Sequence, residues 1–145
     1  MSQSLYSTYL EGLQLRHFAP SELTSQANRQ RGSVKNSLPP PELFSRIVPT
    51  LWVADILRER LGYALTITSA FRNEEYNNAC GGAPRSTHLA NQALDIIPVK
   101  GKVDELWLAA MDLRNGGGFK GGVGRYSSFV HIDTRGKNAT WGRGV

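Results

Sequence analysis

The sequence contains little of what disulfide-rich, membrane-spanning or exported proteins are built from. Its 145 residues include one cysteine, Cys80, which excludes an internal disulfide framework. With no second cysteine and no histidine close in sequence, we interpret Cys80 as a small structural residue rather than a nucleophile. No stretch approaches the roughly 20 consecutive apolar residues of a membrane span. The first residues lack the basic start and apolar core of a secretory signal, so we expect synthesis in the cytoplasm without a signal peptide.

The rest of the composition is that of an ordinary globular protein. Hydrophobic residues make up 40% and charged residues 20% of the chain, which is typical of a protein with a buried core. The length predicts a single domain over residues 1–145, with no internal repeat. Residues 1–38 are polar and rich in Ser and Gln, and we expect them to form an N-terminal extension that packs on the core. The apolar residues of this extension are Leu10, Leu13, Leu15 and Phe18.

Apolar residues at helical spacing predict two long helices, and a capping residue predicts a short helix between them. The first occupies residues 39–62 and begins at three consecutive prolines; Pro49 should kink it or begin a second helix there. The last occupies residues 103–115 and ends at three glycines. Between them, Asn73 is expected to cap a short helix that reaches Ala79. We interpret the first helix as a core element and assign it no chemistry.

Alternating apolar and polar residues predict the strands. Residues 65–68 alternate as a half-buried strand that delivers Arg72 to its C-terminal end. Residues 121–133 indicate two strands joined around Ser127-Ser128. The mixture of strands with separated helices predicts an α+β domain, in which helices pack on one side of a small antiparallel sheet.

Three residues have the chemistry of a metal site: His88, Asp95 and His131. Two neutral imidazoles and a carboxylate suit zinc, and three protein ligands leave the fourth tetrahedral position to water, as in catalytic zinc sites. If Asn91-Gln92 form a two-residue turn, a hairpin places His88 directly opposite Asp95, so one ion could bridge them. Asp95 also lies in an apolar run, where a carboxylate is costly to bury unless it is paired or metal-bound.

The alternative for each histidine is a structural role. A lone histidine in an apolar strand is more often a core or surface residue than a ligand, and it is Asp95 that favours the ligand role for His88. His17 has no carboxylate or histidine at ligand spacing, so we interpret it as structural. Alternation along the last predicted strand places His131 and Asp133 on one face, so these two side chains should be neighbours.

The segments 86–95 and 129–133 resemble a known family. Ser-x-His-x-x-Asn-x-Ala-x-Asp followed by Val-His-x-Asp is similar to the pattern of the zinc D-Ala-D-Ala carboxypeptidases and peptidoglycan endopeptidases of peptidase family M15, in particular their small phage-type members. The resemblance runs from about residue 39 to residue 141 and implies a fold of the Hedgehog and D-Ala-D-Ala-peptidase type. It also includes Ile67-Thr68-Ser69-Ala70-Phe71-Arg72, Tyr76-Asn77, Gly81-Gly82 and Gly121-Gly122-Val123-Gly124-Arg125-Tyr126.

The resemblance implies roles for six of these residues. His88, Asp95 and His131 match the zinc ligands; Arg72 matches an arginine that contacts the carboxylate or carbonyl of a peptide substrate during catalysis; and Ser86 and Tyr126 are expected to bind substrate beside the metal.

Two positions depart from the family pattern. Asn91 replaces the usual glycine, which a turn position tolerates. Ser128 stands where many members carry an acidic base, three residues before the last histidine. Asp133 is the acidic residue that remains nearby, and we predict that it is the catalytic base; the alternative is that it fixes the orientation of a zinc-binding histidine. Glu74 and Glu75 are further candidates, which we interpret as solvated charge at a helix N-terminus.

Together these features predict zinc-dependent hydrolysis of a peptide bond in bacterial peptidoglycan, by an endopeptidase or a D,D-carboxypeptidase that acts as a monomer on the stem peptide. The alternative is a zinc-stabilised cell-wall-binding module or virion structural module whose hydrolytic site has lapsed. The net charge of +5 would attract any polyanion, but Lys and Arg are scattered and no nucleic-acid motif is present, so we expect no nucleic-acid partner. Without an export signal, the wall would be reached by phage-type release or as part of a virion.

Overall fold

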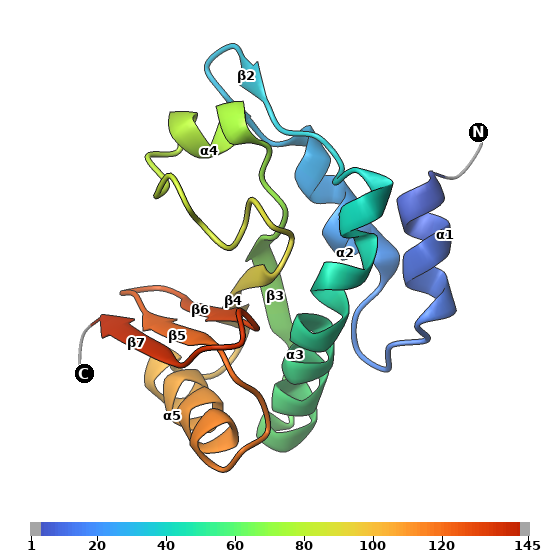
Figure 1. Ribbon diagram of the computed structural model, residues 1–145. Helices are drawn as coiled ribbons and strands as arrows, with labels where there is room; N and C mark the ends of the chain where they lie inside the picture. Colours follow the sequence, from blue (N-terminus) through green and yellow to red (C-terminus); the bar gives the residue numbers. More distant parts are fainter. Residues whose placement is uncertain (1–3, 143–145) are drawn as a thin grey trace.

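The computed structural model describes residues 4–142 and has helices packed against one five-stranded sheet (Figure 1). The predicted α+β class is confirmed. The strand order is β3-β4-β6-β5-β7, and a separate two-stranded hairpin lies near the N-terminus. The strands of the main sheet are β3 (Leu65–Ser69), β4 (Ala93–Pro98), β5 (Gly122–Arg125), β6 (Val130–Asp133) and β7 (Ala139–Gly142).

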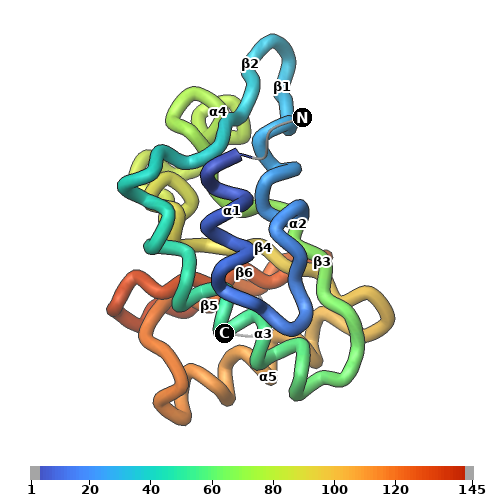
Figure 2. The backbone as a smooth tube through the Cα atoms, turned by 90° about the vertical axis from the view of Figure 1, so that its right-hand side faces the viewer, coloured from blue at the N-terminus to red at the C-terminus, as the bar shows by residue number. Residues whose placement is uncertain are grey.

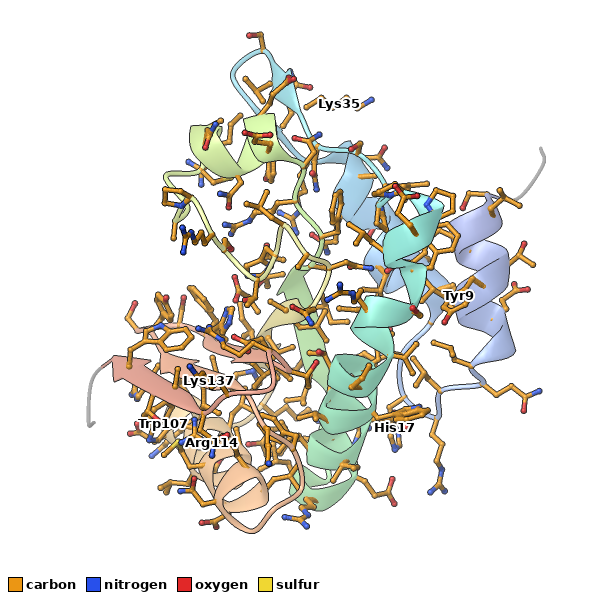
Figure 3. The ribbon with its side chains drawn as sticks, viewed as in Figure 1. Tyr9, His17, Lys35, Trp107, Arg114 and Lys137 are labelled. Carbon is orange, nitrogen blue, oxygen red and sulfur yellow. The ribbon has the colours of Figure 1, made fainter. Side chains whose placement is uncertain are left out.

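Four of these strands pair antiparallel, as the sequence predicts, whereas β7 was not predicted and pairs parallel with β5. Arg114, near the end of α5 (Val103–Asn115), holds β7 in place from beneath the sheet (Figure 3). Its guanidinium donates hydrogen bonds to the Gly121 carbonyl at 3.2 Å, to the Ala139 carbonyl at 2.8 Å and to Thr140 Oγ1 at 2.6 Å. The sheet is therefore mixed at this edge.

The predicted helix over residues 39–62 is divided near Pro49. A 3₁₀ segment, η2 (Pro41–Ile47), is followed by α3 (Val48–Leu61), with Pro49 in its first turn, where the missing N–H costs nothing. Gly62 ends α3 in the left-handed conformation, at φ 76°. The short helix α4 (Glu74–Ala79) begins as predicted, because the Asn73 side chain accepts the Tyr76 N–H.

The two faces of the sheet have different environments. Leu94 and Ile96 of β4, and Val130 and Ile132 of β6, belong to the core cluster that also includes residues of α3 and α5. Because side chains alternate along a strand, Asp95 lies on the opposite face of β4 from these apolar neighbours. One face of the sheet is thus the core, and the other carries polar side chains.

The N-terminal segment contributes to the same core. Helices α1 (Leu5–Gly12) and α2 (Pro20–Thr24) lie side by side along the outside of the fold (Figure 2), and α2 continues into η1 (Ser25–Asn28). After η1 the chain forms the short hairpin of β1 (Gln30–Arg31) and β2 (Val34–Lys35). The core residues from this segment are Tyr6, Leu10, Phe18 and Leu23.

The predicted hairpin pairing His88 with Asp95 is wrong. Both edges of β4 are already occupied, by β3 and by β6, so no edge is left for residues 88–90. These residues form consecutive turns instead, in which the Asn91 N–H bonds the His88 carbonyl and the Gln92 N–H bonds the Thr87 carbonyl. Asn91 does adopt the left-handed backbone expected of it, at φ 57°.

Within residues 4–142, no helix has the length and apolar character needed to cross a bilayer.

Candidate metal centre

Three buried side chains converge on the polar face of the sheet. One ligand atom from each of His88, Asp95 and His131 lies within 4.8 Å of the other two. Asp95 Oδ1 is central: it lies 3.2 Å from His88 Nε2 and 3.1 Å from His131 Nδ1. The three residues predicted as ligands are therefore brought together, and they form a group that could hold a metal ion.

The sheet supplies two of these side chains and a turn supplies the third. Asp95 and His131 are register partners on the adjacent strands β4 and β6, so strand pairing alone places them side by side. His88 lies in the turns that precede β4. The buried Asn91 ties these turns to η2, because its Nδ2 donates to the Leu43 carbonyl at 2.9 Å.

The outer nitrogens of both imidazoles have partners that fix which nitrogen faces inward. His88 Nδ1 lies 2.6 Å from the Ala70 carbonyl oxygen, which can only accept, so Nδ1 carries the proton. His131 Nε2 lies 2.7 Å from Asp133 Oδ2 and donates to it in the same way. The atoms that face inward are then two imidazole nitrogens, each with a lone pair, and a carboxylate oxygen. Three acceptors facing one another fit a cation, so the residues present suit a metal ion.

Electrostatics keep this cluster charged despite its burial. Burial acts to raise the pKa of Asp95, but the two neighbouring imidazoles outweigh this effect and hold the pKa well below its usual range. Burial acts to lower the pKa of His131, but the hydrogen bonds to Asp133 and Asp95 outweigh it and raise the pKa. The Asp95 carboxylate is thus anionic at neutral pH, as a metal ligand must be, whereas the raised pKa of His131 favours a second proton that a binding cation has to displace.

Asp133, predicted as the base, is fully buried, and both of its oxygens are occupied. Oδ2 accepts from His131 Nε2 and, at 2.7 Å, from Arg135 Nη2. Oδ1 accepts from the Gly122 N–H at 2.9 Å and from Arg135 Nε at 2.9 Å. Burial acts to raise the pKa of Asp133, but these hydrogen bonds hold it far below its usual range. The carboxylate bonds the outer nitrogen of His131, which is the geometry of the orienting role.

Arg72 lies at the other side of the cluster. Its Nη2 is 3.8 Å from Asp95 Oδ2, while Nε donates to Ser69 Oγ at 3.2 Å and Nη1 to the Asn77 carboxamide at 3.4 Å. The Arg72 N–H also bonds the His88 carbonyl, at 3.2 Å. The guanidinium is therefore held in place beside the metal-ligand group by three side chains.

A cavity of about 440 Å³ opens in front of the cluster. The predicted substrate-binding residues Arg72, Ser86 and Tyr126 all line it. Two further guanidiniums reach it, from Arg85 and Arg135. Among the described residues that line the cavity, Asp95 is the one carboxylate, so the cavity is cationic overall. Its other lining residues are Cys80, Gly81, Gly82, Ala83, Thr87, His88, Phe129, His131 and Trp141.

Aromatic rings form one wall of the cavity. Tyr126 stacks on Phe129 with ring centroids 4.3 Å apart, and Trp141 Nε1 donates to the Tyr126 hydroxyl at 2.9 Å. The ring centroids of Trp141 and His131 lie 5.0 Å apart. Gly124 makes this approach possible, because a Cβ at that position would overlap the indole.

Arg135 and Trp141 were not among the residues predicted for the site. Arg135 continues the alternation of His131 and Asp133, and this period of two was the available signal. Trp141 lies on the unpredicted strand β7, so no local pattern pointed to it.

The other candidates lie outside this cavity. Glu74 lines a second cavity, of about 510 Å³, beside Leu43 and Phe71, and Glu75 lines neither cavity. His17 lies beside the lower part of α3, away from strands β5–β7 (Figure 3), and its Nε2 is 2.6 Å from Glu59 Oε2.

The sequence of the chain matches a known family of peptidases. A comparison with curated proteins found no match. A family model described as Peptidase M15 matches residues 16–133, which include His88, Asp95 and His131. Because this match covers most of the 145 residues, the chain belongs to the peptidase M15 family.

Proposed function

We propose that this protein is a zinc-dependent peptidase that hydrolyses a peptide bond in bacterial peptidoglycan. Family membership supports peptidase activity. The observation that supports zinc dependence is the group of His88, Asp95 and His131, which lines an open cavity. Three nitrogen and oxygen ligands beside an accessible space are the arrangement of catalytic zinc sites, whereas structural sites are closed by a fourth protein ligand.

His88 Nε2, Asp95 and His131 Nδ1 would hold the zinc. The chemistry that zinc supplies in such sites is Lewis acidity, which polarises a carbonyl group and makes water more acidic. Around it, the Ala70 carbonyl and Asp133 would keep the two imidazoles in the binding tautomer. For Asp133 we therefore propose the orienting role in place of the base role, since both of its oxygens already accept hydrogen bonds.

Arg72 would hold the substrate. Its planar donor fork suits a carboxylate or a developing oxyanion, and Ser69 and Asn77 hold it beside the cluster. The excess of guanidiniums in the cavity supports an anionic peptide as substrate, and the peptidoglycan stem peptide has this character. Ser86 and Tyr126, which also line the cavity, would contact the peptide.

The test is turnover of purified peptidoglycan. Zinc-loaded protein should release new amino groups from sacculi; a chelator should abolish this release, and added zinc should restore it. Release that continues at the same rate after complete removal of metal would contradict the proposal. The positions of the new amino groups would also identify the bond that is cut.

A second candidate is a zinc-stabilised wall-binding or virion module without turnover. The observation that favours it is the absence of any carboxylate besides Asp95 among the described residues that line the cavity, so no free base is at hand. This candidate predicts that zinc-loaded protein cosediments with sacculi but releases nothing from them.

A further inference from the structure

Arg135 lies between the metal-ligand group and the aromatic wall. It lies two residues after the end of β6, and its side chain is about one-third exposed, at 35%. It contacts the cluster through Asp133 and the wall through Trp141, and it lines the cavity. It lies outside the residues that the family model matches.

The contact with Asp133 uses two donors of the Arg135 guanidinium. Nε donates to Oδ1 at 2.9 Å and Nη2 donates to Oδ2 at 2.7 Å, which is the bidentate geometry of a strong arginine–carboxylate pair. The Arg135 N–H adds a third bond, to Oδ1 at 3.1 Å. Asp133 therefore has little freedom to rotate, and its Oδ2 remains directed at His131 Nε2.

The guanidinium is itself held from the other side. Its central carbon lies 5.3 Å from the centre of the Trp141 ring, within the range of a cation–π contact. Trp141 in turn is fixed by its hydrogen bond to Tyr126. A continuous series of contacts thus runs from the aromatic wall through Arg135 and Asp133 to a histidine of the metal-ligand group.

We propose that Arg135 is a positioning residue for the metal centre: it locks Asp133, and through Asp133 it fixes the orientation and tautomer of His131. This inference rests on the proposed function, because it takes His131 as a zinc ligand. Its effect should appear as metal affinity, since partners of the ligating histidines set how well a site is pre-organised for its ion. Loss of the fork should weaken zinc binding even though Arg135 does not touch the ion.

The chain offers a matched control for this test. Arg125 also pairs with a carboxylate through two donors, Nε and Nη2, at 2.8 and 2.6 Å from Asp104 Oδ1. It lies on β5 of the same sheet but outside the cavity. Arg125→Gln therefore removes a second arginine–aspartate pair of this sheet, in which both donors bond one oxygen of the exposed Asp104, without touching Asp133.

The experiment measures zinc dissociation constants by competition with a chromogenic chelator. Arg135→Gln should weaken zinc binding by about 10- to 100-fold, the range found for partners of metal ligands. Arg135→Lys keeps the charge but loses the fork, and should fall between the wild type and Arg135→Gln. Arg125→Gln should leave the constant unchanged. In an Asp133→Asn background, Arg135→Gln should add little, because both changes interrupt one series of contacts.

The outcomes separate two failures. Wild-type zinc affinity in Arg135→Gln, or effects of Arg135→Gln and Asp133→Asn that simply multiply, would overturn the positioning role alone. A wild-type protein that binds no zinc would overturn the proposed function together with this inference. If Arg135→Gln does not fold, Arg135→Lys decides: an unchanged zinc constant in that folded variant overturns the positioning role, and a weakened one supports it.

Discussion

Asp95 and His131 face each other across adjacent strands, with Oδ1 of the carboxylate 3.1 Å from Nδ1 of the imidazole. They are 36 residues apart in sequence, and β-sheet pairing alone brings them together. Because each strand is held by neighbours on both sides, this pair is a rigid foundation for a metal site, and His88 completes the site from a turn.

The first prediction concerns metal content. Wild-type protein should contain about one zinc per chain, since the three ligands form a single group. His88→Ala, Asp95→Ala and His131→Ala should each lower the zinc content measured by elemental analysis to a small fraction of this value. His17→Ala is the control and should retain full zinc, because His17 pairs with Glu59 at a distance from the cluster. Full zinc content in His131→Ala would remove the site as described.

Metal removal should also lower stability. An ion that binds only the folded state adds about 2.7 kcal/mol to the free energy of unfolding when free zinc is 100 times its dissociation constant. The melting temperature should therefore rise with zinc and fall after treatment with a chelator. His131→Ala should show no such zinc-dependent shift, and a shift of equal size in that variant would place the ion elsewhere.

Arg72→Lys should keep zinc but lose turnover. Lysine retains the positive charge but not the planar fork that Ser69 and Asn77 hold in place. We expect peptidoglycan hydrolysis to fall by about 100-fold, as when one donor to a developing oxyanion is removed. A rate equal to that of the wild type would mean that Arg72 only ties the end of β3 to its surroundings.

Asp133→Asn distinguishes an orienting residue from a base. The amide should weaken zinc affinity by about 10- to 100-fold, with the hydrolysis rate recovering in excess zinc. A base would give the opposite pattern: zinc would stay bound and the rate would fall by about 100- to 10,000-fold at every zinc concentration. The rate of this variant across a zinc titration is the measurement.

Gly124→Ala should disturb the aromatic wall. The new methyl group would overlap the Trp141 indole, which must move away from His131 and Arg135. Overpacking of this kind costs about 1–3 kcal/mol, to be read from denaturant unfolding. Gly12→Ala is a matched control, because a Cβ there has no heavy atom within 4 Å. Equal stability of the two variants would show that the indole moves freely.

Local signals in the sequence predicted much of the fold. Pro49 marked the start of α3 and Asn73 the start of α4, because a missing donor and a capping side chain act within a few residues. Alternation over residues 129–133 placed His131 and Asp133 on one face of β6, as the structure has them.

What the sequence could not predict depends on which strands are neighbours. The hairpin around Asn91 was plausible locally and failed because β3 and β6 occupy both edges of β4. Strand β7 is short, ends in glycine and pairs with β5, so no local pattern distinguished it from a loop. Two of the hydrogen bonds to Asp133 were missed for the same reason, because the donors Gly122 and Thr87 come from other segments, whereas Arg135 is a local partner.

The pairing of β4 with β6 also determines when the site can exist. A slip of one residue in this pairing would turn His131 and Asp133 into the apolar core and bring Val130 and Ile132 to the polar face. Only one alignment of the two strands gathers the three ligands, so an ion that binds them selects that alignment over its misaligned competitors. Zinc binding would then stabilise only the correctly aligned strands at the end of folding. Protein refolded without zinc should therefore give a more heterogeneous population than protein refolded with zinc.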